Sequence, residues 1–294
     1  MPSIRQLSQR IKSVKTTAKI TGAMQSVAAM RLRKYTRQSQ LVDSYGSALK
    51  TVLSRIVSNS MDSDEDPLLL TRNIGKTLVV IVAPSRGFCG GLHRSVVLNA
   101  YQKVRELNID PADSDNVEFI TLHKPAYRLM TKLGGRILAF FNGPFKDLNP
   151  YKVLPVSELI YRLWADPDSR FKEVYISYAE PTSSLKANLH FKSILPLDQF
   201  EISKVSDKEI SSESTFLETD VKKILTEFLP QWLEMNVHLA LVQTMAAEEG
   251  ARMIAMSQAS DNAGRLADKL KLVYYRQRQA KITQEISEIV GGSL

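Results

Sequence analysis

Apolar residues in the last part of the chain recur at alternating steps of four and three. The series runs through Val221, Leu225, Phe228, Trp232, Met235, Leu239, Val242, Ala246, Met253 and Met256. Glu249 is its one polar position. This alternation averages 3.5 residues per turn, so the side chains form a narrow seam for one partner helix. Because no proline follows Pro230, the pattern predicts one helix over roughly residues 230–290, about 90 Å long at 1.5 Å per residue.

A similar seam opens the chain. Its first members keep the same spacing and are Ile4, Leu7, Ile11, Val14 and Ala18. The apolar residues then shift to Ile20, Met24, Val27, Leu41, Tyr45, Leu49, Val52 and Ile56. We interpret the shift as a place where a paired helix changes its supercoil winding. Ser3 is the expected N-cap, and the polar residues 59–67 are expected to end the helix.

The middle of the chain has a different pattern. Ten of the 12 prolines fall between Pro67 and Pro196. Short β-branched runs predict strands at 76–83, 117–122, 136–141 and 173–178, with an edge strand at 188–195. Helical patterns between them cover 92–107, 125–133 and 155–164. Alternating strands and helices predict a Rossmann-like, mainly parallel α/β sheet.

The fold class that follows is α/β, with an α/β domain at residues 70–200 inserted between two terminal helices. The helices cover residues 1–60 and 210–294. Each is too long to pack on the inserted domain alone, and each carries a seam. They are therefore expected to form a long antiparallel two-helix coiled coil with each other.

Charge is distributed unevenly in this chain of formal net charge +8. The first 42 residues contain nine Lys or Arg and no Asp or Glu, whereas Asp43 is the first acid. A single cysteine, Cys89, excludes an internal disulfide and favours a reducing compartment. The longest apolar runs are too short to span a bilayer. No direct membrane insertion is expected.

The glycine turn Arg86–Gly91 follows a predicted strand and opens a predicted helix, which is where a phosphate cradle would lie. The turn fits neither G-x-G-x-x-G nor G-x-x-x-x-G-K-[ST]. No acidic residue ends the second strand, where a ribose partner would stand. We therefore favour a structural turn that lets the helix pack close to the sheet, with nucleotide binding as the alternative. Cys89 is interpreted as a small buried thiol rather than a nucleophile.

No catalytic constellation emerges from the motifs. The four histidines are scattered, so neither a metal site nor a cofactor is expected. The basic first helix could bind nucleic acid or a membrane surface, but its apolar seam favours a protein partner. Residues 276–285 are polar nearly all round, which fits either a solvated helix end or a tip that grips other subunits.

Several motifs resemble one family. Residues 10–34, RIKSVKTTAKITGAMQSVAAMRLRK, closely resemble the opening of the gamma subunit of the rotary ATP synthase. RGFCGGLH at 86–93 is similar to the family's RGLCGGLN-like turn, and ILPL at 194–197 to its LLPL segment. The C-terminal motifs AAEEGARMIAMSQASDNA and YYRQRQAKITQEISEIVGG also match the family. The resemblance covers the whole chain, and the two terminal motifs are highly specific in combination.

This resemblance implies a central rotor shaft with no catalytic site of its own. In the family the coiled coil fills the hollow of a ring of three alpha and three beta subunits, while its foot rests on the ring of c subunits with the epsilon subunit. Proton flow turns the shaft and drives the beta sites through ATP synthesis. The implied location is the cytoplasmic side of a bacterial inner membrane, or alternatively the matrix side of the mitochondrial inner membrane.

Matched positions imply which residues contact partners. Met24 resembles the family's methionine that faces an acidic beta loop. The implied beta-subunit contacts are Lys12, Met24, Arg31, Arg33, Arg252, Arg278, Gln279, Thr283 and Glu285. Leu217 and Glu218 stand where the family commonly carries a Tyr-Glu-Pro contact to the c ring. The competing hypotheses are a basic coiled-coil scaffold or nucleic-acid-binding protein, and a nucleotide-binding enzyme.

Overall fold

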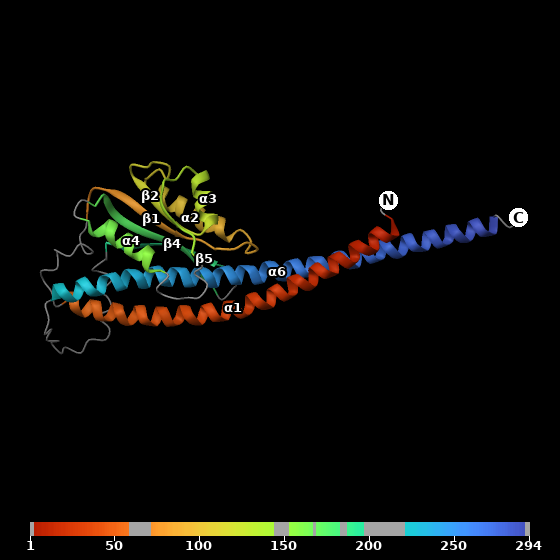
Figure 1. Cartoon of the computed structure of the whole chain (residues 1–294), viewed down its shortest axis with the longest axis horizontal. Helices are drawn as coiled ribbons and strands as arrows, with labels where there is room; N and C mark the ends of the chain where they lie inside the picture. Colours follow the sequence, from red (N-terminus) through yellow and green to blue (C-terminus); the bar gives the residue numbers. More distant parts are fainter. Residues whose placement is uncertain are drawn as a thin grey trace. The chain divides into compact units, whose positions relative to one another are not determined.

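The computed structural model describes residues 3–58, 72–143, 153–166, 169–182, 187–196 and 221–291 (Figure 1). The chain divides into two units. The first contains Met1–Met30 and Arg252–Leu294, and the second contains Arg31–Ala251. Helices α1 (Ile4–Ser58) and α6 (Val221–Gly291) each contribute to both units. The α/β elements, α2 to α4 and β1 to β5, belong to the second unit.

Helix α1 begins and ends close to the predicted residues. Ser3 caps it as expected: the Gln6 backbone N–H donates to Ser3 Oγ at 3.2 Å, and the Ser3 N–H donates to Gln6 Oε1 at 2.8 Å. This reciprocal pair is a capping box, which satisfies two backbone donors at the helix start. Helix α6 begins at Val221, before the predicted start near Pro230. Pro230 therefore lies inside the helix and not in its first turn.

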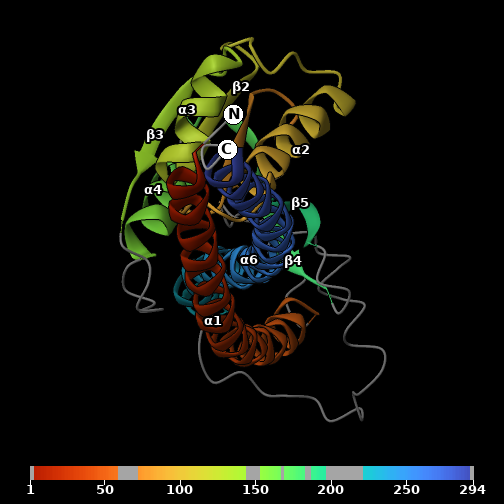
Figure 2. The same cartoon turned by 90° about the vertical axis from the view of Figure 1, so that its right-hand side faces the viewer.

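In the first unit α1 and α6 pack side by side in antiparallel directions (Figure 2). Ser260 Oγ donates to the Ala18 carbonyl at 3.2 Å. The pKa of Asp268 is lowered mainly by its hydrogen bond with Lys271, and Lys15 of α1 also lies near enough to lower it. Residues nearer the start of α1 thus lie beside residues nearer the end of α6, as in an antiparallel pair. Leu7 and Ala28 of α1 are buried, as are Met256 and Ala267 of α6. The predicted antiparallel pairing is confirmed.

The predicted shift in the α1 seam is wrong. Ile20 is 55% exposed and Val27 41%, whereas Thr21 and Ala28 beside them are buried. In the second unit Leu41 and Tyr45 are likewise exposed, and the buried α1 positions as far as Leu49 are Tyr35, Gly46 and Leu49. The seam therefore keeps one 4-3 register from Ile4 to Leu49. Its middle is filled by small or polar residues, so hydrophobicity alone pointed to the wrong row.

Two of these seam residues show why small and polar side chains suit the interface. The Thr21 hydroxyl donates to its own helix, at the carbonyls of Thr17 and Ala18, which satisfies the polar group without a partner from α6. A Cβ added at Gly46 would lie 2.7 Å from Met235 Sδ. Gly46 thus allows the methionine of α6 to approach the backbone of α1 closely.

The prediction of a narrow seam for one partner helix was also incomplete for α6. No residue from Trp232 to Gly250 is exposed. One side of this segment packs on α1, and the other packs on the sheet, where Leu233, Val237 and Leu241 join the hydrophobic core. Because two partners cover this segment, the helix is buried nearly all round, which its 4-3 pattern could not reveal.

The sheet has five strands in the order β3-β2-β1-β4-β5. Pairs β1/β2, β2/β3 and β1/β4 are parallel, and β4/β5 is antiparallel. The strands are β1 (Lys76–Val82), β2 (Val117–Leu122), β3 (Ile137–Phe141), β4 (Phe171–Pro181) and β5 (Ala187–Leu195). The mainly parallel sheet and the edge position of the last strand are confirmed, and β4 is longer than predicted at both ends.

Helices cover both faces of this sheet (Figure 1). Helices α2 (Leu92–Glu106) and α3 (Lys124–Lys132) pack on one face, around a core that includes Val96, Val97 and Met130. Helix α4 (Leu154–Ala165) and α6 pack on the other face, around Ile160 and Trp164. The strand β1 is buried along its whole length after Lys76 because both faces are covered.

Candidate partner-binding surface

The C-terminal end of α6 is exposed on every side from Arg278 to Val290. The last α6 residue of intermediate exposure is Gln277, and the helix continues without cover beyond it. Apolar residues recur here at one face and are Ile282 (44% exposed), Ile286 (56%), Ile289 (72%) and Val290 (59%). An apolar stripe with this spacing, left open to water on a helix end, is typical of a surface that binds another protein.

Four of the predicted contact residues lie on this exposed end. Arg278, Gln279, Thr283 and Glu285 are all exposed. The Thr283 hydroxyl donates to the Gln279 carbonyl at 3.0 Å, and Lys281 forms an ion pair with Glu285 at 3.5 Å. Both interactions stay within one helix turn, so they leave the outer surface of the helix available. The family resemblance pointed to these residues, and their contact with another subunit stays a prediction. The apolar stripe beside them was missed, although its i, i+4, i+7 spacing is readable in the sequence.

The predicted residues of α1 have different environments. Lys12 and Arg33 are exposed, and Met24 is partly buried beside the seam. Arg31 is paired within the chain: its Nη1 lies 3.6 Å from Oε1 of the buried Glu249. Part of the positive charge of α1 therefore compensates a carboxylate of α6 rather than facing outward.

Arg252 is buried, with only 6% of its surface exposed. Arg252 is the residue at which the α6 part of the first unit begins, and this part of α6 packs against α1. A contact between this guanidinium and another subunit stays a prediction, and it requires the side chain to leave its present position. Leu217 and Glu218, the predicted c-ring contacts, lie outside the described residues.

The glycine turn joins β1 to α2. Phe88 is 71% exposed and has φ of 62°, and Gly90 has φ of 61°. Cys89 is buried, and its thiol donates to the Arg86 carbonyl at 3.3 Å, as expected for a structural cysteine. A Cβ added at Gly90 or Gly91 would meet nothing within 4 Å. The predicted reason for these glycines, close packing of the helix on the sheet, is therefore wrong; Gly90 is favoured instead by its left-handed backbone.

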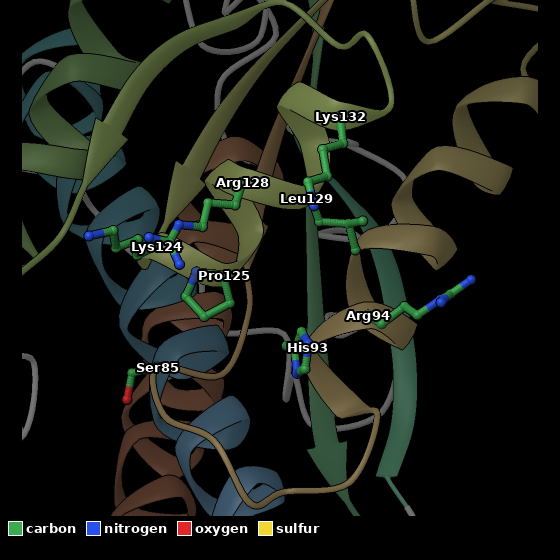
Figure 3. A pocket seen from close by; sticks show the side chains of 8 residues that line it. All are labelled: Ser85, His93, Arg94, Lys124, Pro125, Arg128, Leu129 and Lys132. Carbon is green, nitrogen blue, oxygen red and sulfur yellow. The ribbon is translucent and has the colours of Figure 1, made fainter.

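A basic cavity of about 530 Å³ opens between the first turn of α2 and one face of α3 (Figure 3). It is lined by Ser85, His93, Arg94, Lys124, Pro125, Arg128, Leu129 and Lys132. Lys124, Arg128 and Lys132 follow one another at steps of four on α3, whereas His93 and Arg94 come from α2. Figure 3 shows the Arg94 guanidinium directed away from Lys124. Among the described residues, none of the four Lys and Arg side chains pairs with a carboxylate.

His123 lies directly before α3, at the end of β2, and it is nearly buried. Its backbone has φ of 72° and ψ of 145°, a region that residues other than glycine rarely adopt. Burial lowers the pKa of its imidazole to about 4, because the charged form loses its hydration. The imidazole is therefore neutral at pH 7 and does not add to the charge of the basic cavity.

Within the part of the chain that the structure describes, no group of three or more His, Cys, Asp or Glu side chains is placed to hold a metal ion. None of the described helices is both long and apolar enough to cross a membrane.

Comparison with known proteins gives consistent results. Residues 3–294 match the family described as ATP synthase. The ATP synthase gamma chain of Nitrosomonas eutropha is 31% identical over 297 aligned residues, covering 100% of this chain and 99% of the relative. The gamma chain of Geotalea daltonii is 32% identical, covering 100% and 98%.

Two solved structures share the fold. One shows the central stalk and c ring of the Tetrahymena thermophila mitochondrial ATP synthase, with a TM-score of 0.61 and 19% identity over 82% of this chain and 99% of that chain. The other shows a Euglena gracilis mitochondrial ATP synthase, with a TM-score of 0.52 and 19% identity over 92% and 94%. At this identity the matches establish the architecture alone.

Proposed function

Because the chain belongs to the ATP synthase family, in which its full-length relatives are gamma chains, we propose that it is the central rotor shaft of an ATP synthase. The shaft carries torque between a c ring and the catalytic beta subunits, and it has no catalytic site of its own. Proton flow through the membrane part drives the rotation that leads to ATP synthesis. The same coupling in reverse uses ATP hydrolysis to turn the shaft.

The observation that carries this proposal is the uncovered end of α6. Residues 278–290 are exposed on every side, and they combine an apolar stripe with polar side chains on the remaining faces. A ring of three alpha and three beta subunits offers a central opening in which such a helix end would be enclosed. The shaft would enter the ring by this end, with Gln279, Thr283 and Glu285 beside the stripe.

The helix pair suits torque transmission for a physical reason. Helix α1 keeps one 4-3 register from Ile4 to Leu49 and packs against α6 within each unit, and a packed helix pair resists twisting better than either helix alone. The exposed Lys12 and Arg33 of α1 supply positive charge that would attract acidic loops of the beta subunits. Arg31 contributes less, since Glu249 already pairs with it.

The remaining partners belong to the same proposal. A c ring and an epsilon subunit would contact the α/β domain and the foot that includes Leu217 and Glu218. The complex is peripheral to the membrane on this account, on the cytoplasmic side of a bacterial inner membrane.

Reconstitution tests the proposed function. Purified chain is mixed with alpha and beta subunits, and both subunit stoichiometry and ATP hydrolysis are measured. The proposal predicts a complex with one copy of this chain and hydrolysis that the chain alone lacks. Assembly without this chain incorporated would contradict it. Binding of the free chain to duplex DNA with a steep salt dependence would support the scaffold or nucleic-acid hypothesis instead.

A further inference from the structure

We propose that Glu248 of α6 is an internal anionic ligand of the turn between β1 and α2. Its carboxylate occupies the switch-point crevice, where doubly wound α/β domains bind their ligands. In doing so it closes that site to outside anions and fastens the α/β domain to α6. The inference concerns the second unit only and does not depend on the rotor function.

The topology places the site. In the order β3-β2-β1-β4-β5, the chain leaves β1 toward β2 on one side and later reaches β4 on the other side. The carboxyl ends of β1 and β4 therefore border the switch-point crevice, where open α/β sheets bind their ligands. The turn after β1 and the start of α2 would face a bound phosphate there, with backbone N–H groups as donors.

Glu248 reaches this turn with an almost fully buried side chain, 4% exposed. Its Oε2 accepts the Ser85 backbone N–H at 2.7 Å and lies 3.4 Å from the Ser85 hydroxyl, which also donates to it. A short bond from a backbone N–H to a carboxylate is charge-assisted and is stronger than a neutral hydrogen bond. A backbone donor of the turn that borders the crevice is thus already bound to an oxygen of the chain itself.

One helical turn earlier, Thr244 closes the rest of the crevice. Its hydroxyl accepts the Ala179 N–H of β4 at 3.2 Å and donates to the Val82 carbonyl of β1 at 3.2 Å. Thr244 is only 2% exposed, so no room is left there for a ligand. Thr244 bonds to both strands that border the crevice and Glu248 bonds to the turn after β1, and this makes α6 the occupant of the switch point.

Charges around Glu248 are consistent with an anion site. The pKa of Tyr35 is raised mainly by burial and secondly by Glu249, with a smaller contribution from Glu248. It is lowered by Arg31 and Arg86. Arg86 belongs to the turn itself, so a cation of the turn and the buried carboxylate both lie within electrostatic reach of Tyr35. The basic cavity also opens at this turn, with Ser85 on its wall. A buried carboxylate is tolerated when hydrogen bonds and nearby cations compensate for its lost hydration.

Chemical rescue tests the proposal on the full chain. Glu248→Ala removes the internal anion, and the thermal midpoint of unfolding is measured in sodium acetate or sodium phosphate against sodium chloride at equal ionic strength. We expect Glu248→Ala to unfold at a lower temperature and to recover stability as acetate or phosphate is added, in a saturable way. The Ser85 amide signal should shift with the same concentration dependence. The parent chain should show only the non-saturating rise that excluded salts give to folded proteins in general, and no shift of the Ser85 amide signal.

Two variants make the result decisive. Thr244→Val breaks the neighbouring hydrogen bonds without opening an anion site, so it should lose stability that no anion restores. Glu248→Gln keeps the volume and covers the case in which the alanine variant does not fold. Because a neutral acceptor binds more weakly, its Ser85 amide should exchange with solvent roughly five- to tenfold faster. Unchanged exchange in Glu248→Gln, or a Glu248→Ala variant that gains no more stability from acetate or phosphate than the parent chain does, would overturn the proposal.

Discussion

Arg170 holds the carboxylate of Glu118, with Nη2 and Oε2 2.8 Å apart and the Glu118 side chain fully buried. Lys76 and Arg136 approach the other oxygen at 3.4 and 3.6 Å. The cluster joins the start of β1, the start of β2 and the segments before β3 and β4. One buried carboxylate therefore ties together four neighbouring strands at the amino end of the sheet.

Replacing Glu118 should destabilise the α/β domain strongly. Glu118→Ala leaves three cations without their common partner, and we expect the free energy of unfolding to fall by about 2–4 kcal/mol. The loss is smaller than for a fully buried ion pair because the cations are partly exposed to water. Urea unfolding followed by the fluorescence of the buried Trp164 measures the loss. Glu106→Gln, which breaks an exposed pair with Lys103, is the control and should change stability by less than about 0.5 kcal/mol. Equal effects of the two variants would contradict this account.

The register of the α1 seam can be tested with two adjacent residues. Ala28 is 1% exposed and Val27 is 41% exposed. Ala28→Leu inserts volume into a packed seam and should lower stability by about 1–3 kcal/mol. Val27→Leu should change it by no more than about 0.5 kcal/mol. Denaturation followed by helical circular dichroism distinguishes the two registers, since the shifted seam predicts the opposite order.

Sequence patterns were sufficient for the architecture. Residues 117–122 formed the predicted strand with the same ends, because a β-branched run bounded by polar residues has few alternatives. The middle of the α1 seam failed because Thr21, Ala28 and Gly46 are buried for their size and not for their hydrophobicity. Burial of α6 on two sides also escaped prediction, since the sheet that covers its second side is built from distant residues.

The candidate site was predicted unevenly. The positions of Gln279 and Thr283 on an exposed helix end agree with a contact role, which itself stays a prediction. The bond between Ser85 and Glu248 joins residues 163 positions apart in the chain, and no local pattern indicates it. The cations of the basic cavity come from two helices. The sequence shows the spacing of the three cations on α3, but it does not show that Arg94 of α2 lines the same cavity.

Acid should destabilise the chain through His123. Its pKa is lowered to about 4 in the folded state from an ordinary value of 6.5, so the unfolded chain binds the proton first as the pH falls. Stability from this group is complete above pH 6.5 and is lost progressively between pH 6.5 and 4. The loss is at most about 3 kcal/mol. His123→Asn should flatten the decline in urea midpoint over this range, and an unchanged slope would contradict the assignment.

The apolar stripe of α6 should matter only in the assembled complex. Ile286→Asp places a charge where a partner surface is expected, and it should reduce ATP hydrolysis of the reconstituted complex at least about tenfold. The variant loses an apolar contact with the partner and buries a charge in the interface. Gln284→Asp introduces the same charge on the face of the helix opposite the stripe and should retain most of the activity. Both free chains should unfold at the parent temperature. Full activity of Ile286→Asp would remove the stripe from the interface.

Rotation of single complexes tests the central claim most directly. The alpha and beta subunits are fixed to a surface, a bead is attached to the α/β domain of this chain, and ATP is supplied. The rotor proposal predicts stepwise turning of the bead in one direction that stops when ATP is withdrawn. A bead that only fluctuates about a fixed angle, on complexes that hydrolyse ATP, would show that this chain is not the rotating shaft.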